Sequence, residues 1–502
     1  MPEIRASASA GPVVGILHYT CPPVVGGVEW MMAQHAGLLI EHGMDVRVLA
    51  GRGGRFRRDA PLDTIPALDS KYPALLEVND ELQRGEVSER FDALVGELTE
   101  RLRTAFAGLD ACIVHNALSL HFNLPLTAAL WNLARAGEAP LIIAWCHDLA
   151  WTNPLYTPLM RERLPWSLLK SRLPGARYVV VSEDRRRDLL ALWGTDLHPP
   201  APSPSHGGRG DKAALGGRKP SPSMGEGWVE ATDDPVVIPA GIDRVAKLRL
   251  RSSTVALARQ LRFDDAWPFM LLPARITKRK NIEYAIRVTR ALRDLGRKPL
   301  LLVTGPPGPH NVRSVDYVDE LQAERAALDV RDEVVFLYEE RRPGGRGWRA
   351  TDAMMDDLYQ LADLLLFPSA QEGFGIPLLE AGLVRLPVFG SDIPPFREIA
   401  GADAHLFDLN EPPLAVAERI STFLDSDPSV RLRRRVLDAF TWEGVFAGRI
   451  APLLAPLARA SAATPPGSSS LGPATASDTK PATPLDDFGT GAHDVDEPRR
   501  GR

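Results

Sequence analysis

The stretch Asp363–Gly382, DLLLFPSAQEGFGIPLLEAG, carries the clearest local signal in this 502-residue sequence. An uncharged aliphatic run is followed by a loop with two glycines and then by a helix with proline in its first turn. This order predicts a buried strand, a tight turn and a helix, which is the repeating unit of a parallel sheet wrapped by helices. The expected fold class is therefore α/β.

The same unit recurs in two series along the chain. The expected strands are 13–19, 45–50, 110–115, 140–146 and 177–181 in the first half, and 269–273, 299–304, 333–337, 363–368 and 387–390 in the second. Helix-compatible segments such as 28–42, 282–295 and 376–384 lie between them. Two Rossmann-like, doubly wound domains follow, and the ligand of such a sheet lies beyond the carboxyl ends of its strands.

Composition excludes several classes of protein. Lys and Arg number 59 against 64 Asp and Glu, so the net charge of -5 does not predict a nucleic-acid partner. Hydrophobic residues make up 44% and charged residues 25%, which is typical of globular domains with sizeable cores. The three cysteines form no CxxC pair, so a reducing compartment is expected and a thiolate metal site is not. Without a leader-like start or a bilayer-length apolar run, we expect a cytoplasmic protein and leave peripheral membrane contact open.

Proline, at 44 residues, is concentrated in two segments that also contain much Gly and Ser. Because these segments have few aliphatic residues, they cannot bury enough surface to offset the entropy of ordering. The predicted division is a flexible N-terminus 1–12, a first Rossmann-like domain 13–198 for the acceptor, a disordered insertion 199–235, a second Rossmann-like domain 236–440 for the donor, a terminal helix 441–459, and a disordered tail 460–502.

The loop after the first strand contains Gly26 and Gly27 ahead of a helix. Paired glycines let the backbone approach a ligand closely and leave helix amides free for an anion. A tight strand-to-helix turn explains them equally well. No Gly-x-Gly-x-x-Gly pattern follows this strand, which disfavours a nicotinamide-dependent dehydrogenase.

The loop after the first strand of the second half, 274–281, reads ARITKRKN and opens a helix. Four cations at a helix N-terminus repel one another and oppose the helix dipole unless an anion compensates them. A diphosphate suits that position. We assign Arg275 and Lys280 to the anion, and Lys278 and Arg279 to a solvated basic turn. Residues 304–310 also end a strand, and they either present amides to the donor or form a stiff loop.

Two carboxylates, Glu372 and Glu380, lie eight residues apart in the opening stretch. Glu372 falls in the loop and Glu380 in the second turn of the helix, so both can face one ligand. Between them, Gly373 and Gly375 present amides ahead of the helix. We expect Glu372 near a sugar and Glu380 at paired ribose hydroxyls, with a solvent-facing role as the alternative for Glu380.

With these motifs in order, the chain resembles the retaining glycosyltransferases of family four (glycosyl transferases group 1), over about 13–457 apart from the insertion. Gly26–Glu29 resembles that family's N-terminal glycine loop, and Arg275 with Lys280 resembles its diphosphate-binding pair. Residues 238–243 resemble its interdomain segment, although Ala240 replaces the usual Asn. The resemblance implies a GT-B fold, two Rossmann-like domains facing across a cleft, with a terminal helix crossing back to the first domain.

The resemblance also implies roles for individual residues. His147, at the end of a strand in WCHD, corresponds to the histidine that approaches the transferred sugar, and it is expected to be catalytic together with Glu372. A core histidine held by Asp148 is the structural alternative for His147. Donor-binding residues are expected to be Gly27, Arg275, Lys280, Gly373, Phe374, Gly375 and Glu380. Acceptor-binding candidates are Gly26, His115 and Asn116.

The predicted reaction moves a hexose from a nucleoside-diphosphate sugar, such as UDP-glucose or GDP-mannose, to a hydroxyl of a small-molecule, glycan or lipid acceptor. No other cofactor is expected. Arg275, Lys280 and the helix N-termini would neutralise the departing phosphate, so no metal is expected either. The alternatives are a GT-B sugar-nucleotide epimerase or phosphorylase, and a non-catalytic sugar-nucleotide-binding protein. The basic stretch 161–172 fits either membrane contact or an ordinary helix with a buried apolar face.

Overall fold

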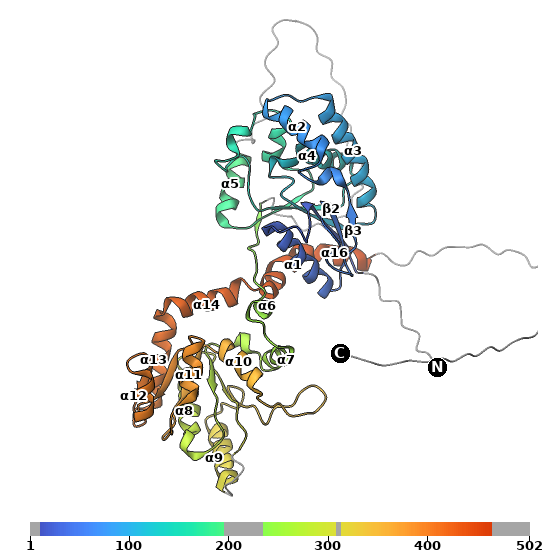
Figure 1. The fold of residues 1–502 in the computed structure, drawn as a ribbon. Helices are drawn as coiled ribbons and strands as arrows, with labels where there is room; N and C mark the ends of the chain where they lie inside the picture. The colour runs from blue at the N-terminus through green and yellow to red at the C-terminus, as the bar shows by residue number, and fades with distance from the viewer. Residues whose placement is uncertain (1–10, 195–233, 308–312, 464–502) are drawn as a thin grey trace, which may run out of the picture.

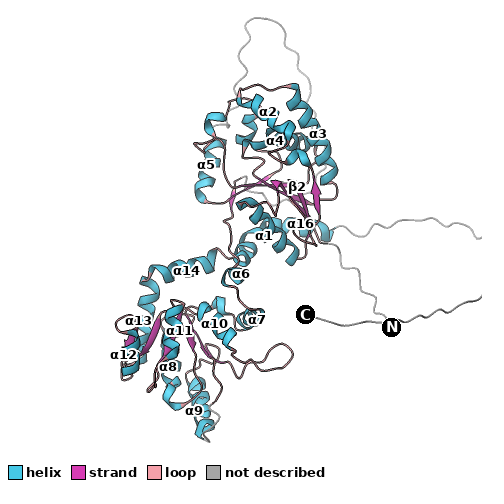
Figure 2. Cartoon of the chain, viewed as in Figure 1, coloured by secondary structure: helices cyan, strands magenta, loops and turns pink. Residues whose placement is uncertain are grey.

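The computed structural model describes residues 11–194, 234–307 and 313–463. It contains two parallel sheets, each wrapped by helices, with one sheet in each half of the chain (Figure 1; Figure 2). The predicted α/β class with two doubly wound domains, the GT-B type of architecture, is confirmed. The predicted N-terminal segment 1–12, insertion 199–235 and tail 460–502 lie outside the described residues except at their edges.

The first sheet has the strand order β3-β2-β1-β4-β5-β6-β7, and all its pairings are parallel. Its strands are β1 (Val13–Thr20), β2 (Asp45–Arg52), β3 (Leu62–Thr64), β4 (Ala111–His115), β5 (Leu141–Cys146), β6 (Arg177–Val180) and β7 (Val236–Val237). The short strands β3 and β7 at the two edges were not predicted, because neither has enough apolar residues to form a recognisable run.

The helices of the first domain divide between the two faces of this sheet. They are α1 (Gly27–Glu41), α2 (Pro73–Gln83), α3 (Glu89–Phe106), α4 (Leu124–Ala136) and α5 (Glu183–Gly194), with short 3-10 turns η1 (Pro66–Leu68), η2 (His121–Asn123), η3 (Thr157–Leu159) and η4 (Trp166–Lys170). Successive side chains of a strand point to opposite faces. In β4, Cys112 and Val114 pack with α2, α3 and α4, while Ala111 and Ile113 pack with α1.

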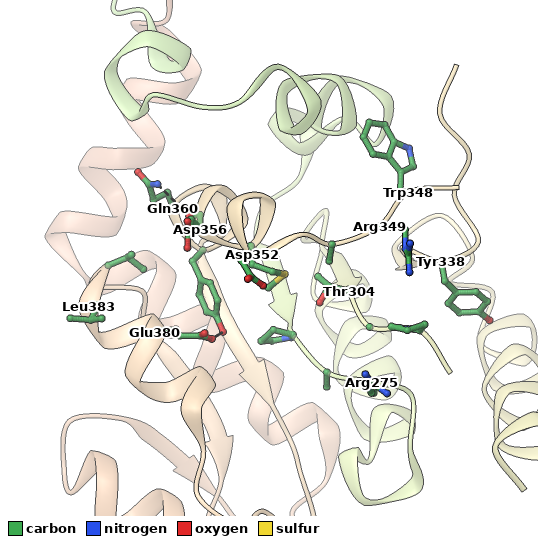
Figure 3. A pocket seen from close by; sticks show the side chains of 18 residues that line it. Arg275, Thr304, Tyr338, Trp348, Arg349, Asp352, Asp356, Gln360, Glu380 and Leu383 are labelled. Atoms are coloured by element: carbon green, nitrogen blue, oxygen red, sulfur yellow. Dashed lines mark hydrogen bonds between the residues drawn. The ribbon is translucent and has the colours of Figure 1, made fainter. Parts of the chain in front are cut away.

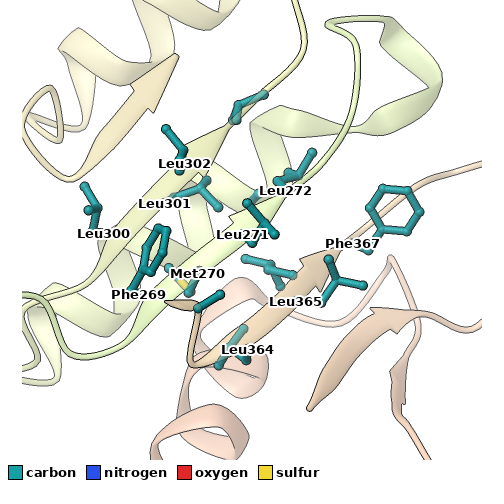
Figure 4. Packing of buried hydrophobic residues seen from close by; sticks show 14 of the residues in the cluster. Phe269, Met270, Leu271, Leu272, Leu300, Leu301, Leu302, Leu364, Leu365 and Phe367 are labelled. Atoms are coloured by element: carbon teal, nitrogen blue, oxygen red, sulfur yellow. The ribbon is translucent and has the colours of Figure 1, made fainter. Parts of the chain in front are cut away.

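The second sheet has the order β10-β9-β8-β11-β12-β13 and is also parallel. Its strands are β8 (Phe269–Leu272), β9 (Leu300–Val303), β10 (Val334–Phe336), β11 (Leu364–Phe367), β12 (Val388–Ser391) and β13 (His405–Phe407). The central strands are apolar along their whole length because helices cover both of their faces. Figure 4 shows the side chains of β8, β9 and β11 packed together in this core.

The helices of the second domain alternate with these strands. They are α6 (Arg244–Leu248), α7 (Ser252–Gln260), α8 (Ile282–Asp294), α9 (Arg313–Ala327), α10 (Asp352–Leu361), α11 (Ile376–Leu383), α12 (Pro394–Ala400), α13 (Pro413–Ser426) and α14 (Pro428–Ala439), with 3-10 turns η5 (Phe263–Asp265) and η6 (Lys278–Lys280).

The last described segment returns to the first domain. It comprises α15 (Trp442–Val445), a π-helical turn η7 (Phe446–Ile450) and α16 (Ala451–Ala463). Trp442 and Phe446 are buried in the same cluster as strand residues of the first sheet, and Arg177 donates to the Leu453 carbonyl oxygen at 2.7 Å. Gly241 lies so close to Trp442 that an added Cβ would be 2.5 Å from the indole ring.

Both sheets reverse their strand order at one place, between β1 and β4 in the first and between β8 and β11 in the second. Neighbouring connections leave such a point on opposite sides of the sheet, so a crevice opens beyond the strand ends. The loops that follow these four strands carry most of the predicted site residues. The topology therefore makes these two strand ends the positions for ligands.

Candidate functional site

Lys280 and Glu372 meet at the reversal point of the second sheet. Lys280 comes from the turn after β8 and Glu372 from the loop after β11, and the ammonium group donates to Glu372 Oε1. Arg279 Nη1 lies 3.0 Å from Glu372 Oε2. Only about a tenth of either side chain of the Lys280–Glu372 pair is exposed, so this is a nearly buried ion pair. Two residues predicted for the same ligand are thus in direct contact.

Burial and pairing act in opposite directions on the pKa values of these two groups. Burial lowers the pKa of Lys280, and the contacts with Glu372 oppose that shift without cancelling it. Burial by itself raises the pKa of Glu372, but the hydrogen bond from Lys280 and the nearby cations outweigh burial and lower it. Glu372 is therefore an ionised carboxylate at neutral pH, available to stabilise positive charge but not to donate a proton.

Arg275 and Glu380 line a cavity of about 920 Å³, whose wall does not include Lys280 or Glu372 although it is built partly from the loop after β8 that carries Lys280. The cavity lies between α10, α11 and the loops that follow β8, β9 and β10 (Figure 3). Glu380 Oε2 accepts a hydrogen bond of 2.5 Å from the Tyr359 hydroxyl. Thr304, Gly305 and Pro306 form part of the wall, while 308–310 of the predicted 304–310 loop lie outside the described residues.

The glycine loop before α11 leaves the start of this helix open. Gly375 has φ of 123° and precedes α11 without a side-chain cap, so first-turn amides of the helix lack an intrahelical partner. An added Cβ at Gly375 would lie 3.0 Å from the Phe396 ring. At Gly373, by contrast, an added Cβ would have no atom within 4 Å. Phe374, between them, is 52% exposed. Of the predicted donor residues in this turn, Gly373 and Phe374 are exposed beside Glu372, while Gly375 is buried.

In the first domain, His115 and His147 end the neighbouring strands β4 and β5. His115 Nδ1 lies 2.9 Å from His147 Nε2, so one ring nitrogen donates and the other accepts. Asn116 adopts a left-handed backbone with φ of 60°, and its side-chain oxygen accepts from the His147 amide at 2.9 Å. Asp148 instead contacts Asn153 and Arg185. His147 is therefore positioned by His115 and Asn116, with no described contact to Asp148.

These histidines belong to a buried row that extends to the returning segment. The His35 ring stacks on His115 at 5.4 Å between centroids and meets Trp442 edge-on at 5.7 Å. His18 Nδ1 lies 3.1 Å from the His115 carbonyl oxygen, to which it donates. Burial, with a smaller contribution from neighbouring histidines, lowers the pKa of His147 to about 4 and that of His35 to about 3. The row is neutral at physiological pH.

Gly26 and Gly27 lie at the start of α1, after β1. Gly26 is the N-cap residue, and an added Cβ there would overlap the Glu29 carboxylate, which accepts from Thr20. Gly27 has open space where a Cβ would be. The two glycines therefore differ: Gly26 is required by its neighbour Glu29, and Gly27 faces space that a ligand can occupy.

The predicted residues thus form two groups, one in each domain. Within the described residues, no hydrogen bond or ion pair joins the side chains of His147 or His115 to those of Glu372 or Lys280. Sequence reasoning missed Tyr359, and it assigned Arg279 to solvent although this arginine contacts Glu372. It also missed the part of the cavity wall formed by the connection after β10. Trp348, which lies in this long glycine-rich connection, was the sequence feature that could have indicated it.

Among residues 11–194, 234–307 and 313–463, no three His, Cys, Asp or Glu side chains are placed to share a metal ion. The four histidines of the buried row, His18, His35, His115 and His147, are included in that statement. Within the same part of the chain, no helix has the length and apolarity needed to cross a bilayer.

Comparison with known families gives a match within the second domain. Residues 256–437 match the model of the family described as glycosyl transferases group 1. This segment contains β8 to β13 and all the donor-binding residues predicted in the second half. The predicted resemblance to glycosyltransferases is confirmed over this segment.

Individual relatives match shorter stretches. The serotype-specific mannosyltransferase WbdA of Escherichia coli is 34% identical over 112 residues, which is 22% of this chain and 14% of that protein. The O-antigen chain mannosyltransferase RfbU of Salmonella typhimurium is 38% identical over 84 residues, 17% of this chain and 21% of that protein. The matches therefore span about a fifth or less of these relatives. A sucrose-phosphate synthase structure from Thermosynechococcus elongatus has 16% identity and a TM-score of 0.32, with 90% of this chain and all of that chain covered.

Proposed function

We propose that this protein is a retaining glycosyltransferase of family four that transfers a hexose from a nucleoside-diphosphate sugar to an acceptor hydroxyl. The observation that carries the proposal is the meeting of Lys280 and Glu372 at the reversal point of the second sheet, in the loops that lead to the cavity-lining residues Arg275 and Glu380. All four residues lie in the segment that matches the glycosyl transferases group 1 family.

Each charged group in this arrangement has a matching part of the donor. Arg275 and Lys280 are cations next to the uncapped start of α11, and together they suit a diphosphate. Glu380 lines the cavity and suits the two ribose hydroxyls, each of which can donate a hydrogen bond to a carboxylate. Glu372 remains for the sugar. When a donor binds, the Lys280 ammonium can move from Glu372 to the phosphate, because both anions lie at the same strand ends.

The chemical step breaks the bond between the anomeric carbon and the leaving phosphate oxygen and forms a bond to the acceptor oxygen on the same face of the sugar. The acceptor proton passes to the departing phosphate. Lys280, Arg275 and the helix amides stabilise the negative charge that develops on the phosphate. The ionised Glu372 stabilises the positive charge that develops on the sugar ring. These groups provide the charge neutralisation that a divalent cation would supply, so the proposed reaction needs no metal.

His147 has a different role in this proposal. A histidine with a pKa of about 4 is neutral at physiological pH and cannot serve as a cation. It can still hydrogen-bond a sugar hydroxyl once the first domain meets the donor. His115 and Asn116 hold it in place for that contact. Gly26 and Gly27, at the start of α1, belong to the same face and suit the acceptor and the donor respectively.

The test is a transfer and hydrolysis assay with a panel of UDP-, GDP- and ADP-hexoses in EDTA, with GDP-mannose included because two relatives are mannosyltransferases. At least one donor should release nucleoside diphosphate, and the product should keep the donor's anomeric configuration by NMR. Glu372→Gln should lower the rate at least 100-fold while nucleotide affinity changes little.

Other outcomes favour the alternatives. Binding without turnover by the wild type would identify a non-catalytic sugar-nucleotide-binding protein. Conversion of the sugar without transfer would identify an epimerase. A product with inverted anomeric configuration would reject the retaining mechanism. A rate that requires a divalent metal would reject metal independence.

A further inference from the structure

We propose that the base pocket of the donor site selects guanine, with Asp352 and Arg349 as the residues that recognise it. This inference deepens the proposed function, on which it rests, by naming the nucleotide class of the donor. It is carried by the charged side chains that line the cavity around Glu380 and by what each of them already contacts.

Most of the cavity's charges already have a partner or a proposed role. Glu380 accepts from Tyr359, and Asp356 lies 3.7 Å from Arg251. Arg275 makes no hydrogen bond or ion pair with the described residues and faces the diphosphate in the proposed function. Two charges of opposite sign remain without a hydrogen bond or ion pair in the described part of the chain, Asp352 and Arg349. Figure 3 places them on either side of Thr304.

The backbone positions of these two side chains are fixed by their neighbours. Trp348, next to Arg349, is 4% exposed, donates to Gln260 at 3.1 Å and lies beneath the Arg342 guanidinium at 4.6 Å. Thr351, next to Asp352, caps α10 by accepting from the Met354 amide at 3.2 Å. Because the cap is already supplied, Asp352 is not needed to satisfy the helix amides.

Guanine is the base whose edges match this pair of charges. Its N1–H and 2-amino groups are adjacent donors, which a single carboxylate can accept together, while its O6 and N7 are adjacent acceptors, which one guanidinium can bind in bidentate fashion. A ligand held by Asp352 on one edge and Arg349 on the other would lie across Thr304, whose side chain is buried and bonds to no described residue.

The other common bases match less well. Adenine presents the 6-amino donor next to the N1 acceptor, so a carboxylate placed there would face a lone pair. Uracil has a single N–H between two carbonyl oxygens, and both of these would repel a carboxylate. A purine also uses more of the cavity of about 920 Å³ than a pyrimidine does.

The experiment measures the affinity of the purified protein for GDP, IDP, UDP and ADP in EDTA by calorimetry. IDP is GDP without the 2-amino group, so it removes one of the two bonds to Asp352 and nothing else. GDP should bind about tenfold more tightly than IDP, and more tightly still than UDP or ADP. In Asp352→Asn, the GDP affinity should fall about tenfold and the preference for GDP over IDP should disappear.

The matched control is Asp332→Asn, at an exposed aspartate just before the amino end of β10, whereas the cavity lies beyond the carboxyl ends of the strands. It should leave all four affinities unchanged. Arg349→Ala should lower the affinities for GDP and IDP by the same factor, because both bases retain O6 and N7.

Each remaining result rejects a defined statement. If UDP or ADP binds as tightly as GDP, or if Asp352→Asn keeps the preference for GDP over IDP, guanine recognition by Asp352 is wrong while the proposed function stands. If the wild type binds no nucleotide, both proposals are wrong. If circular dichroism shows that Asp352→Asn does not fold, the affinities of the wild-type protein for the four nucleotides test the proposal: guanine selection requires that GDP binds more tightly than IDP, UDP and ADP.

Discussion

Both domains place polar side chains at the carboxyl ends of strands at or next to the reversal point of their sheets, but the first uses neutral histidines and the second uses paired charges. His115 ends β4 and His147 follows β5; both have lowered pKa values, and a hydrogen bond joins the two rings. Lys280 and Glu372 follow β8 and β11 and form an ion pair. The same topology therefore supplies a position for chemistry without fixing what kind of chemistry occurs there.

The two sets of residues differ in how they respond to the free-energy penalty of burying a charge. A histidine buried without a carboxylate partner loses its proton, since desolvation penalises the charged form. A lysine and a glutamate buried together keep their charges, since each compensates the other. In the proposed reaction the charge develops on phosphate and sugar, so charged groups are needed in the donor domain. The first domain needs only hydrogen bonds that orient a sugar.

The largest effect is expected from Lys280→Ala in the second domain. It removes a cation from the diphosphate and leaves Glu372 with only Arg279, so donor turnover should fall about 100-fold or more and nucleotide affinity should fall with it. The matched control is Lys278→Ala, two residues away, where the side chain instead pairs with Glu320. Steady-state kinetics and calorimetry measure both variants. Equal effects of the two would show that the turn acts only through its overall charge.

Acid should destabilise the first domain before the second. The pKa values of His35 and His147 are about 3 and about 4 in the folded chain, below the ordinary 6.5, so as pH falls from 6.5 to about 4 the unfolded chain takes up protons that the folded chain does not. Stability is present above pH 6.5 and is lost through that window, by about 2.6 kcal/mol for each histidine at pH 4.5. The lowered pKa of Glu372 means that its contribution is lost only below about pH 4.5.

Hydrogen exchange at pH 7 and pH 5, analysed by mass spectrometry, measures this difference within one sample. After correction for the intrinsic rates, amides of β4 and β5 should lose protection relative to those of β8 and β11. His35→Phe keeps the packing against Trp442 and should reduce that loss. Equal loss of protection in the two sheets would contradict the assignment of the acid sensitivity to the histidine row.

A smaller effect is expected from His115→Leu, which removes the hydrogen bond to His147 at similar volume. Turnover should fall about fivefold, since one hydrogen bond to a positioned group is worth about 1 kcal/mol, while nucleotide affinity stays unchanged. His115→Asn, whose side chain can replace the Nδ1 contact, should recover part of the loss. If His115→Leu weakens nucleotide binding instead, the first domain contributes to binding the nucleotide, which contradicts the proposal that the second domain alone binds it.

The smallest effect is expected from Gly27→Ala. No atom lies within 4 Å of the added Cβ, and alanine favours a helix over glycine, so the free energy of unfolding should rise by about 0.5 kcal/mol. Donor turnover should nevertheless fall, because the methyl group occupies space left for the ligand. Gly26→Ala is the matched comparison, and it should lower stability because its Cβ displaces Glu29 from Thr20. Unchanged turnover in Gly27→Ala would remove this glycine from the site.

Much of the fold was predictable because parallel sheets have a strong local signature. All ten expected strands are present, and the boundaries differ from the observed ones by one or two residues. The edge strands β3, β7 and β13 were not predicted, because two or three residues paired on one side need no distinctive sequence. The long connection after β10 contains Trp348 and Arg349, and the tryptophan among its glycines was its one sequence signal; that its side chains line the same cavity as residues of α10 and α11 is decided only in three dimensions.

The sequence by itself determined the two α/β domains, the strand-end loops and the residue types at the candidate site of the second domain, because apolar runs, glycine spacing and helix starts are local properties of the chain. Only the tertiary structure decided which of those residues meet. It placed Arg279 on Glu372, Tyr359 on Glu380 and His115 on His147, three contacts between segments far apart in the sequence. The physical reason is that charge state and reactivity depend on burial and on partners, and both are set by how the strands are ordered in the sheet.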